Sequence, residues 1–235
     1  MDVAFFLKER IAFIRRLYEG ASSTFVERMR KIENGEEPFV PPYSEDAEPA
    51  FQNEWIEADT SLQVLGHACI SMLAAALHLY LETWAKELRL NCRASHGKVF
   101  KNKGWFHGYS VYFESCLGIQ FDQTPANPSV LEEVVLARNR IAHPESILSA
   151  KANYAADDLG KLRRPLFLDE RTSGLSDLPD LERFLLFPPM IHVTGEKLAF
   201  ALAEVERFCT WLESQITSKL YGQRQGGDDS CPTSR

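Results

Sequence analysis

The chain has 235 residues, 45% of them hydrophobic, which is enough to bury one sizeable core, so we expect a single domain with decorations. Its formal net charge is −7. This acidic balance excludes a general nucleic-acid-coating protein, so any binding of RNA must rest on a local basic patch. The five cysteines are scattered and form no C-x-x-C pair, which argues against a disulfide framework and a zinc site. The sequence therefore predicts a reduced, cytoplasmic protein.

Residues 1 to 34 have a helical spacing of apolar side chains, which the stretch Gly20 to Ser23 interrupts and Asn34-Gly35 ends. We interpret this segment as a helical hairpin. Its first apolar run is too short to be a signal peptide. The polar stretch from Glu36 to Pro49 contains several prolines and is expected to form a linker. The predicted divisions are a helical extension and linker at 1–49, a helical bundle at 50–221 and a disordered tail at 222–235.

One long helix is predicted from about Ala50 to Leu90. Its central part is apolar enough to suggest a membrane span, but His67, Ser71 and His78 interrupt it and acids flank it. We therefore expect a central helix of the bundle and no membrane association. His67 and His78 lie too far apart along the helix to share a metal ion, and we expect core or rim histidines with hydrogen-bond partners.

A basic segment free of acids follows this helix, and aromatic residues come directly after it. Cations interleaved with aromatic rings can follow a phosphate backbone and stack on unpaired bases. In the alternative, the cations belong to a solvated loop that leads into an amphipathic helix with the aromatic residues in its core. Both interpretations stay open. The candidate RNA-binding cations here are Arg93, Lys98, Lys101 and Lys103.

The segment Leu131 to Glu145, LEEVVLARNRIAHPE, combines an apolar helical face with a cluster of polar residues. Ser129 is expected to cap this helix, with Glu132 completing a capping box. The helix should end at His143, because the following Pro144 disfavours helical geometry at that position. Burying unpaired charges is costly, so we expect the polar cluster to lie at a rim, in a cleft or against a partner. Its members are Arg138, Asn139, Arg140 and His143.

These residue types suit the cleavage of a phosphodiester without a metal. The Arg138 guanidinium can stabilise charge on a phosphorane, and an imidazole such as that of His143 can transfer protons near neutral pH. Asn139 would orient them, and Glu82 or Asp59 could support the site as an acid. In the alternative, Arg138 and Arg140 pair with acids of neighbouring segments and His143 merely ends a helix.

The run Arg138-Asn139-Arg140-Ile141-Ala142-His143 resembles the R-x4-6-H motif of HEPN domains, in which a polar residue, often Asn, follows the Arg. The resemblance implies an all-α bundle, usually a homodimer, in which the motifs of two subunits line one cleft and often act as a metal-independent RNase. Many such domains belong to toxin-antitoxin, abortive-infection or other defence systems, and some are inactive binding modules. One subgroup carries a Tyr two residues after the His and is nucleotidylated there, but Glu145 takes that place here.

The region after the motif, Ser146 to Leu185, has weak periodicity and is expected to form a loop-rich insert. Leu166 to Leu168 and Met190 to Val193 could form a small two-stranded element. Thr194 is then expected to cap a last helix, whose apolar stripe is typical of a core element.

The sequence thus predicts an all-α, HEPN-like helical bundle whose leading function is that of a metal-independent endoribonuclease. Arg138, Asn139 and His143 are the predicted catalytic residues, and Arg140 adds a further RNA contact. The expected partners are RNA, a second copy of the chain, and an antitoxin or regulatory protein, and no cofactor or metal is implied. One alternative is a catalytically silent module that binds RNA, a nucleotide or a protein. Another is an interaction scaffold in which Arg138 is a structural ion pair.

Overall fold

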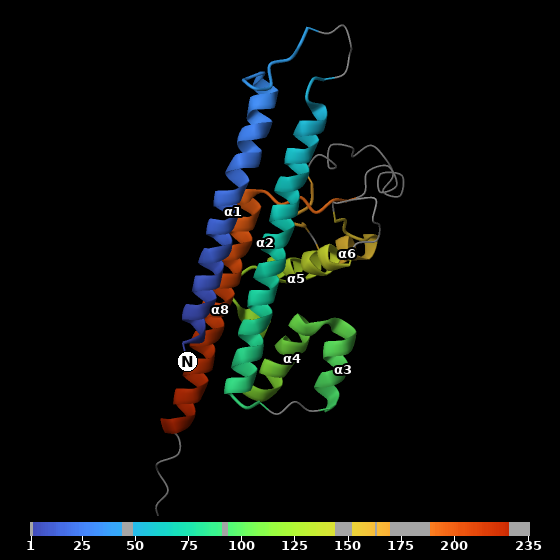
Figure 1. The fold of residues 1–235 in the computed structure, drawn as a ribbon. Helices are drawn as coiled ribbons and strands as arrows, with labels where there is room; N and C mark the ends of the chain where they lie inside the picture. The colour runs from blue at the N-terminus through green and yellow to red at the C-terminus, as the bar shows by residue number, and fades with distance from the viewer. Residues whose placement is uncertain are drawn as a thin grey trace, which may run out of the picture.

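The structure is a computed structural model that describes residues 2–43, 49–90, 94–143, 152–162, 164–169 and 189–225. Within these ranges it contains helices and two isolated antiparallel bridges but no β-strand, which confirms the predicted all-α fold class. The helices, shown in Figure 1, are α1 (Val3–Asn34), α2 (Gln52–Glu87), α3 (Ala94–Lys103), α4 (Trp105–Leu117), the 3-10 turn η1 (Phe121–Gln123), α5 (Pro128–Ala142), α6 (Ala156–Lys161) and α8 (Gly195–Gln225).

Residues 3 to 34 form one continuous helix, so the predicted hairpin is wrong. A glycine inside a helix costs only about 1 kcal/mol, and this cost is outweighed by the apolar face that α1 buries between Val3 and Tyr18. Asp2 caps the start of α1 by accepting a hydrogen bond from the Phe5 amide at 2.9 Å. Gly35 ends the helix in the left-handed region, at φ 63°. The helix runs antiparallel to α2 and also packs against α8 (Figure 1).

The predicted long helix from about Ala50 to Leu90 is confirmed as α2, which packs against α1, α4, α5 and α8. Its core side chains Ile70, Leu73 and Leu77 are fully buried. Length and composition alone would allow α2 to cross a membrane, but 56% of its apolar window is buried within the fold. In this structure α2 is therefore a core helix, while the cytoplasmic location stays a prediction.

Three short extended segments lie beside α2. Two of them, around Leu166–Leu168 and Met190–Val193, are the segments expected to pair, and they are joined by an isolated bridge, while the segment at Asn153 was not expected. Met190 bridges to Asn153 and Ile191 bridges to Leu168, so the segment at 189–193 lies between the other two. Two polar side chains of α2 hold this segment. Gln63 accepts a hydrogen bond from the Val193 amide at 2.9 Å. His67 donates through Nε2 to the Ile191 carbonyl at 3.0 Å, which confirms a hydrogen-bonded core histidine.

Gly66 on α2 is required because the segment at 189–193 approaches the helix backbone very closely. A Cβ at this position would lie 2.6 Å from the Cβ of Val193.

We expect Gly66→Ala to lower the free energy of unfolding by about 1–3 kcal/mol, as for other overpacked cores, measured by urea denaturation. The matched control is Gly20→Ala in α1, where nothing lies within 4 Å of the new Cβ. That change should stabilise the protein by about 0.5–1 kcal/mol, and equal effects of the two substitutions would contradict the packing.

Candidate functional site

Helix α5 carries the motif residues, which we define as Arg138, Asn139 and His143. The helix is capped by Asn127, whose side chain accepts a hydrogen bond from the Ser129 amide at 3.1 Å, so the predicted cap at Ser129 is wrong. Pro128 occupies the first turn, where its fixed φ and missing N–H are tolerated. The backbone amide of Asn127 donates to the buried carboxylate of Glu204 on α8 at 2.6 Å. The start of α5 is therefore fixed by its own cap and by α8.

Glu133 is a buried carboxylate on α5, and sequence analysis did not single it out. It is 1% exposed. The Tyr154 hydroxyl donates to it at 2.6 Å, and the amides of Leu166 and Phe167 donate at 2.6 and 2.8 Å. Burial raises the pKa of Glu133, although these hydrogen bonds and the charge of Lys197 oppose the rise. Glu133 thus attaches the extended segments of the insert to the motif helix.

The motif residues lie exposed at the C-terminal end of α5. A guanidinium nitrogen of Arg138, Nη1, donates to the side-chain oxygen of Asn139 at 3.1 Å. The two side chains are therefore in contact, and the orienting role of Asn139 stays a prediction. The helix ends at Ala142, and His143 leaves it with φ −128° and ψ 68°, which confirms the predicted end. Pro144 and Glu145 lie outside the described residues.

The two arginines of the motif run differ in their partners. Arg140 donates through Nε to Asp158 on α6 at 2.5 Å, and the Asp158 side chain is only 5% exposed. Asp158 also accepts a hydrogen bond from the Ala155 amide at 3.0 Å. Arg140 therefore forms a structural ion pair with Asp158. A contact between Arg140 and RNA stays a prediction. Arg138 forms no ion pair with any carboxylate of the described ranges.

A second histidine, His78 of α2, lies within the electrostatic reach of Arg138. Burial lowers the pKa of His78, Glu82 opposes that effect, and the charges of Arg138 and Lys86 lower it further. Its ring lies against Trp105 of α4, with the ring centroids 4.7 Å apart. Both α4 and α5 thus pack against α2.

The two predicted supporting acids lie on α2. Glu82 binds Lys86 at 2.7 Å and interacts electrostatically with His78. Asp59 is buried at 6% exposure. A supporting role of either acid at His143 stays a prediction.

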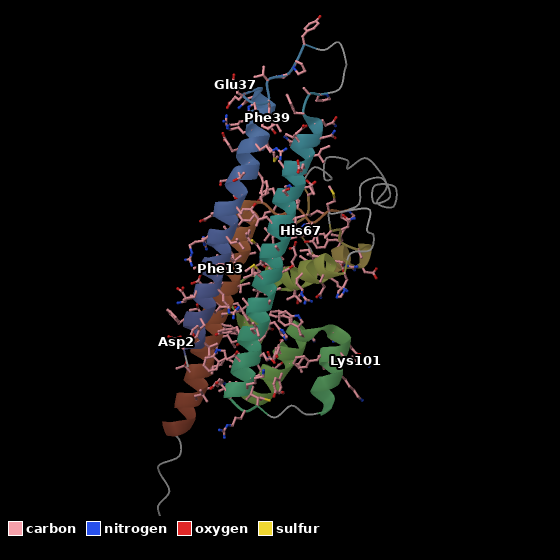
Figure 2. All side chains as sticks on the ribbon, viewed as in Figure 1. Asp2, Phe13, Glu37, Phe39, His67 and Lys101 are labelled. Atoms are coloured by element: carbon pink, nitrogen blue, oxygen red, sulfur yellow. The ribbon has the colours of Figure 1, made fainter. Side chains whose placement is uncertain are left out.

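The basic segment before α4 is exposed, but most of the aromatic side chains after it are not. Lys98, Lys101 and Lys103 lie exposed on α3, and Lys101 projects away from the bundle in Figure 2. Arg93 lies outside the described residues. Tyr109 and Tyr112 are only 7% and 5% exposed. They are therefore core residues, as the alternative interpretation of this segment predicted. Contact of the lysines with RNA stays a prediction.

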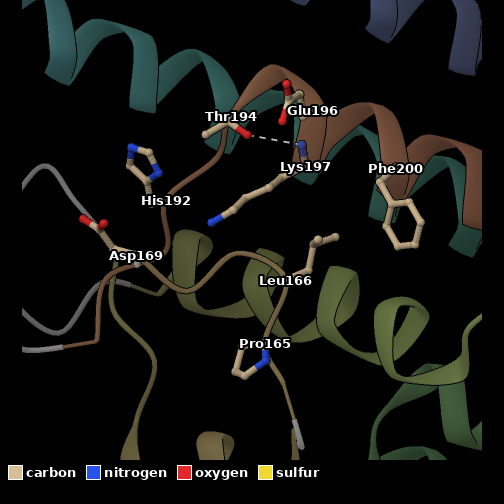
Figure 3. Close-up of a pocket in the computed structure, with 8 residues that line it drawn as sticks. All are labelled: Pro165, Leu166, Asp169, His192, Thr194, Glu196, Lys197 and Phe200. Carbon is tan, nitrogen blue, oxygen red and sulfur yellow. Dashed lines mark hydrogen bonds between the residues drawn. The ribbon is translucent and has the colours of Figure 1, made fainter. Parts of the chain in front are cut away.

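A groove of about 740 Å³ lies between the insert and the start of α8 (Figure 3). Its wall includes the buried carboxylate of Asp169, the imidazole of His192 and the ammonium group of Lys197. Lys197 donates through Nζ to the Leu168 carbonyl at 2.8 Å, and its amide donates to Thr194 at 3.2 Å, which confirms the predicted cap of α8. The groove mixes both signs of charge and therefore favours no polyanion. Sequence reasoning missed it because its walls come from separate segments.

Among the described residues, no group of three or more His, Cys, Asp or Glu side chains is placed to hold a metal ion. No family model, curated protein or solved structure matches the chain. The likeness to HEPN domains accordingly rests on the motif run and on the helical pattern around it.

Proposed function

We propose that the protein is a metal-independent endoribonuclease of HEPN type. The observation that carries the proposal is the exposure of the motif residues, together with an Arg138 guanidinium that pairs with no carboxylate of the described ranges. The neighbouring Arg140, by contrast, forms an ion pair with Asp158. A planar, permanently charged guanidinium beside an exposed imidazole suits a phosphodiester.

The reaction that these groups favour is attack of a ribose 2′-hydroxyl on the adjacent phosphorus. An imidazole of the motif accepts the hydroxyl proton as the new P–O bond forms, and Arg138 stabilises the negative charge on the phosphorane. The bond to the 5′-oxygen then breaks, and that oxygen takes a proton from a second imidazole. The products are a 2′,3′-cyclic phosphate and a free 5′-hydroxyl.

A second copy of the chain would supply the second imidazole. A single His143 cannot be an unprotonated base and a protonated acid in the same step. In the proposed homodimer, the two motifs face one cleft, so one His143 serves as base and the other as acid. The exposed position of the motif at the end of α5 is compatible with such a cleft.

The biological setting in this proposal follows from the resemblance alone. HEPN ribonucleases often act in toxin-antitoxin or other defence systems. On that basis the protein would act in the cytoplasm on cellular or invading RNA, and an antitoxin or regulatory protein would control it.

The test is incubation of purified wild-type protein with a mixture of single-stranded and structured RNA in the presence of EDTA. We expect cleavage, because the proposed chemistry uses only arginine and histidine side chains. Intact RNA together with a folded protein, as judged by circular dichroism, would reject the nuclease and favour the silent module that only binds a ligand. A pull-down would then search for a protein partner.

A further inference from the structure

The outer face of α2 is apolar although it is exposed to solvent. Residues 60–81 of this helix include no Asp, Glu, Lys or Arg. A surface helix of a globular protein normally carries charged or polar side chains on its solvent side. Here the exposed positions between 60 and 81 are Val64, Ala68, Ala75 and Leu79, which we call the α2 strip. Val64 and Leu79 are large side chains that stay 49% and 43% exposed.

A shallow groove extends the α2 strip onto α1. The groove has a volume of about 210 Å³, and Leu79 and Phe6 both line it. Phe6 is 56% exposed, and Phe13, two turns further along α1, is 51% exposed. Contiguous apolar surface that a soluble protein leaves open to solvent marks an interaction site. The α2 strip and its extension on α1 therefore call for a partner.

The α2 strip has the same pattern in both chain directions. Val64 and Leu79 lie at its two ends, and Ala68 and Ala75 each lie one turn inside an end. Spacings of one and two turns place all four residues on one face of the helix. In an antiparallel pair of strips, Val64 of one copy therefore lies opposite Leu79 of the other. The small alanines between them allow the two helices to approach closely.

Charged residues continue this symmetry beyond the strip. Glu57 precedes Val64 by the same two turns by which Lys86 follows Leu79. Their side chains are 68% and 71% exposed, and their own ion pairs, with Arg28 and Glu82, are surface pairs that are weak and easily exchanged. An antiparallel arrangement brings Glu57 of each copy to Lys86 of the other, whereas a parallel arrangement brings like charges together. The charges thus favour the antiparallel pair.

The size of the surface suits a second copy of the chain. The helix from Glu57 to Lys86 is roughly 44 Å long and about 10 Å wide. Two such faces bury on the order of 900 Å² in total, close to the roughly 1,000 Å² of a specific interface, and Phe6 adds to this area. A membrane fits less well, because helices that lie on lipid are rich in Lys and Arg, whereas this chain has a net charge of −7.

We propose that two copies of the chain associate through the α2 strip, antiparallel, about a two-fold axis between Ser71 and Met72. The inference rests on the proposed function for the role of the dimer, which is to supply the second imidazole, whereas the surface is argued from α2 alone. Because α5 packs against α2, each motif helix is attached directly to the helix that forms the interface.

The experiment measures self-association of the full chain by sedimentation equilibrium near physiological salt. We expect the wild type to form a dimer and Ala68→Arg to raise its Kd at least about 100-fold, because the symmetry places the new cation in the interface twice. Ala68 is exposed in the monomer, so the circular dichroism should not change. The matched control is Thr217→Arg at an exposed position of α8, which packs on the buried side of α2. This variant should dimerise like the wild type.

Charge reversal tests the antiparallel arrangement. Glu57→Lys and Lys86→Glu should each weaken the dimer about tenfold, because each substitution turns two attractive pairs into repulsive pairs. The chain that carries both substitutions should dimerise like the wild type, since both pairs form again with their signs exchanged. A double variant that associates more weakly than either single variant would contradict the arrangement.

The remaining outcomes separate the interface from the catalysis. A wild type that stays monomeric, or a dimer that Ala68→Arg leaves intact, would overturn the interface whether or not the protein cleaves RNA. A dimer that Ala68→Arg disrupts but that cleaves no RNA would support the interface and reject the nuclease. Wild-type monomers that bind phospholipid vesicles would assign the α2 strip to a membrane and would also overturn the inference.

Discussion

Arg138→Ala and His143→Ala are each expected to lower the rate of RNA cleavage by about 10²–10⁴-fold, the usual contribution of a positioned acid, base or charge-stabilising group. Both side chains are exposed, so the loss should occur without a change in circular dichroism, thermal midpoint or oligomeric state. The measurement is the single-turnover cleavage rate in EDTA with variants of matched fold.

The controls for this prediction come from the same chain. His107 is an exposed histidine on α4 outside the motif, and Arg16 is an exposed arginine on α1. Their alanine variants should cleave RNA at the wild-type rate. A His143→Ala protein that retains wild-type activity would remove His143 from the mechanism.

Glu133→Ala is expected to lower the free energy of unfolding by about 3 kcal/mol or more, because buried donors left without an acceptor each cost about 1–3 kcal/mol. The change removes the acceptor of three hydrogen bonds, because the Tyr154 hydroxyl and the backbone amides of Leu166 and Phe167 all donate to this one carboxylate. Urea denaturation measures the loss, which should also detach the insert from α5 and raise hydrogen exchange at residues 166–169.

The neighbouring Glu132 gives a matched control for this prediction. It lies on the same helix and carries the same charge, but it is exposed. Glu132→Ala should change the free energy of unfolding by no more than about 0.5 kcal/mol, as surface substitutions usually do. A Glu133→Ala protein as stable as the Glu132→Ala protein would show that the three hydrogen bonds do not hold the insert.

Periodicity and local capping signals predicted a large part of this fold. The apolar stripes of α2 and α8 define both helices, Thr194 caps the second of them, and Pro144 places the end of α5 at Ala142. These features depend on neighbours in the sequence, so a single chain reveals them. The same logic identified the exposed motif, because unpaired charges on an apolar helix must reach its rim.

Features that depend on distant contacts were not predicted. The sequence suggested a break at Gly20, but burial against α2 and α8 keeps α1 continuous. Glu133 looks like an ordinary charged residue of a helix, since its donors lie more than twenty positions further along the chain. The groove beside Asp169, His192 and Lys197 also takes its walls from separate segments. Such sites arise only from tertiary packing.

The most direct test of the central claim is identification of the RNA ends that the wild-type protein and His143→Ala leave in EDTA. The proposed attack by the 2′-hydroxyl predicts 2′,3′-cyclic phosphate and 5′-hydroxyl ends with the wild type, the same ends formed about 10²–10⁴-fold more slowly with His143→Ala, and no cleavage at a position carrying a 2′-deoxyribose. Products with 3′-hydroxyl and 5′-phosphate ends, or cleavage that continues at the deoxy position, would contradict the account.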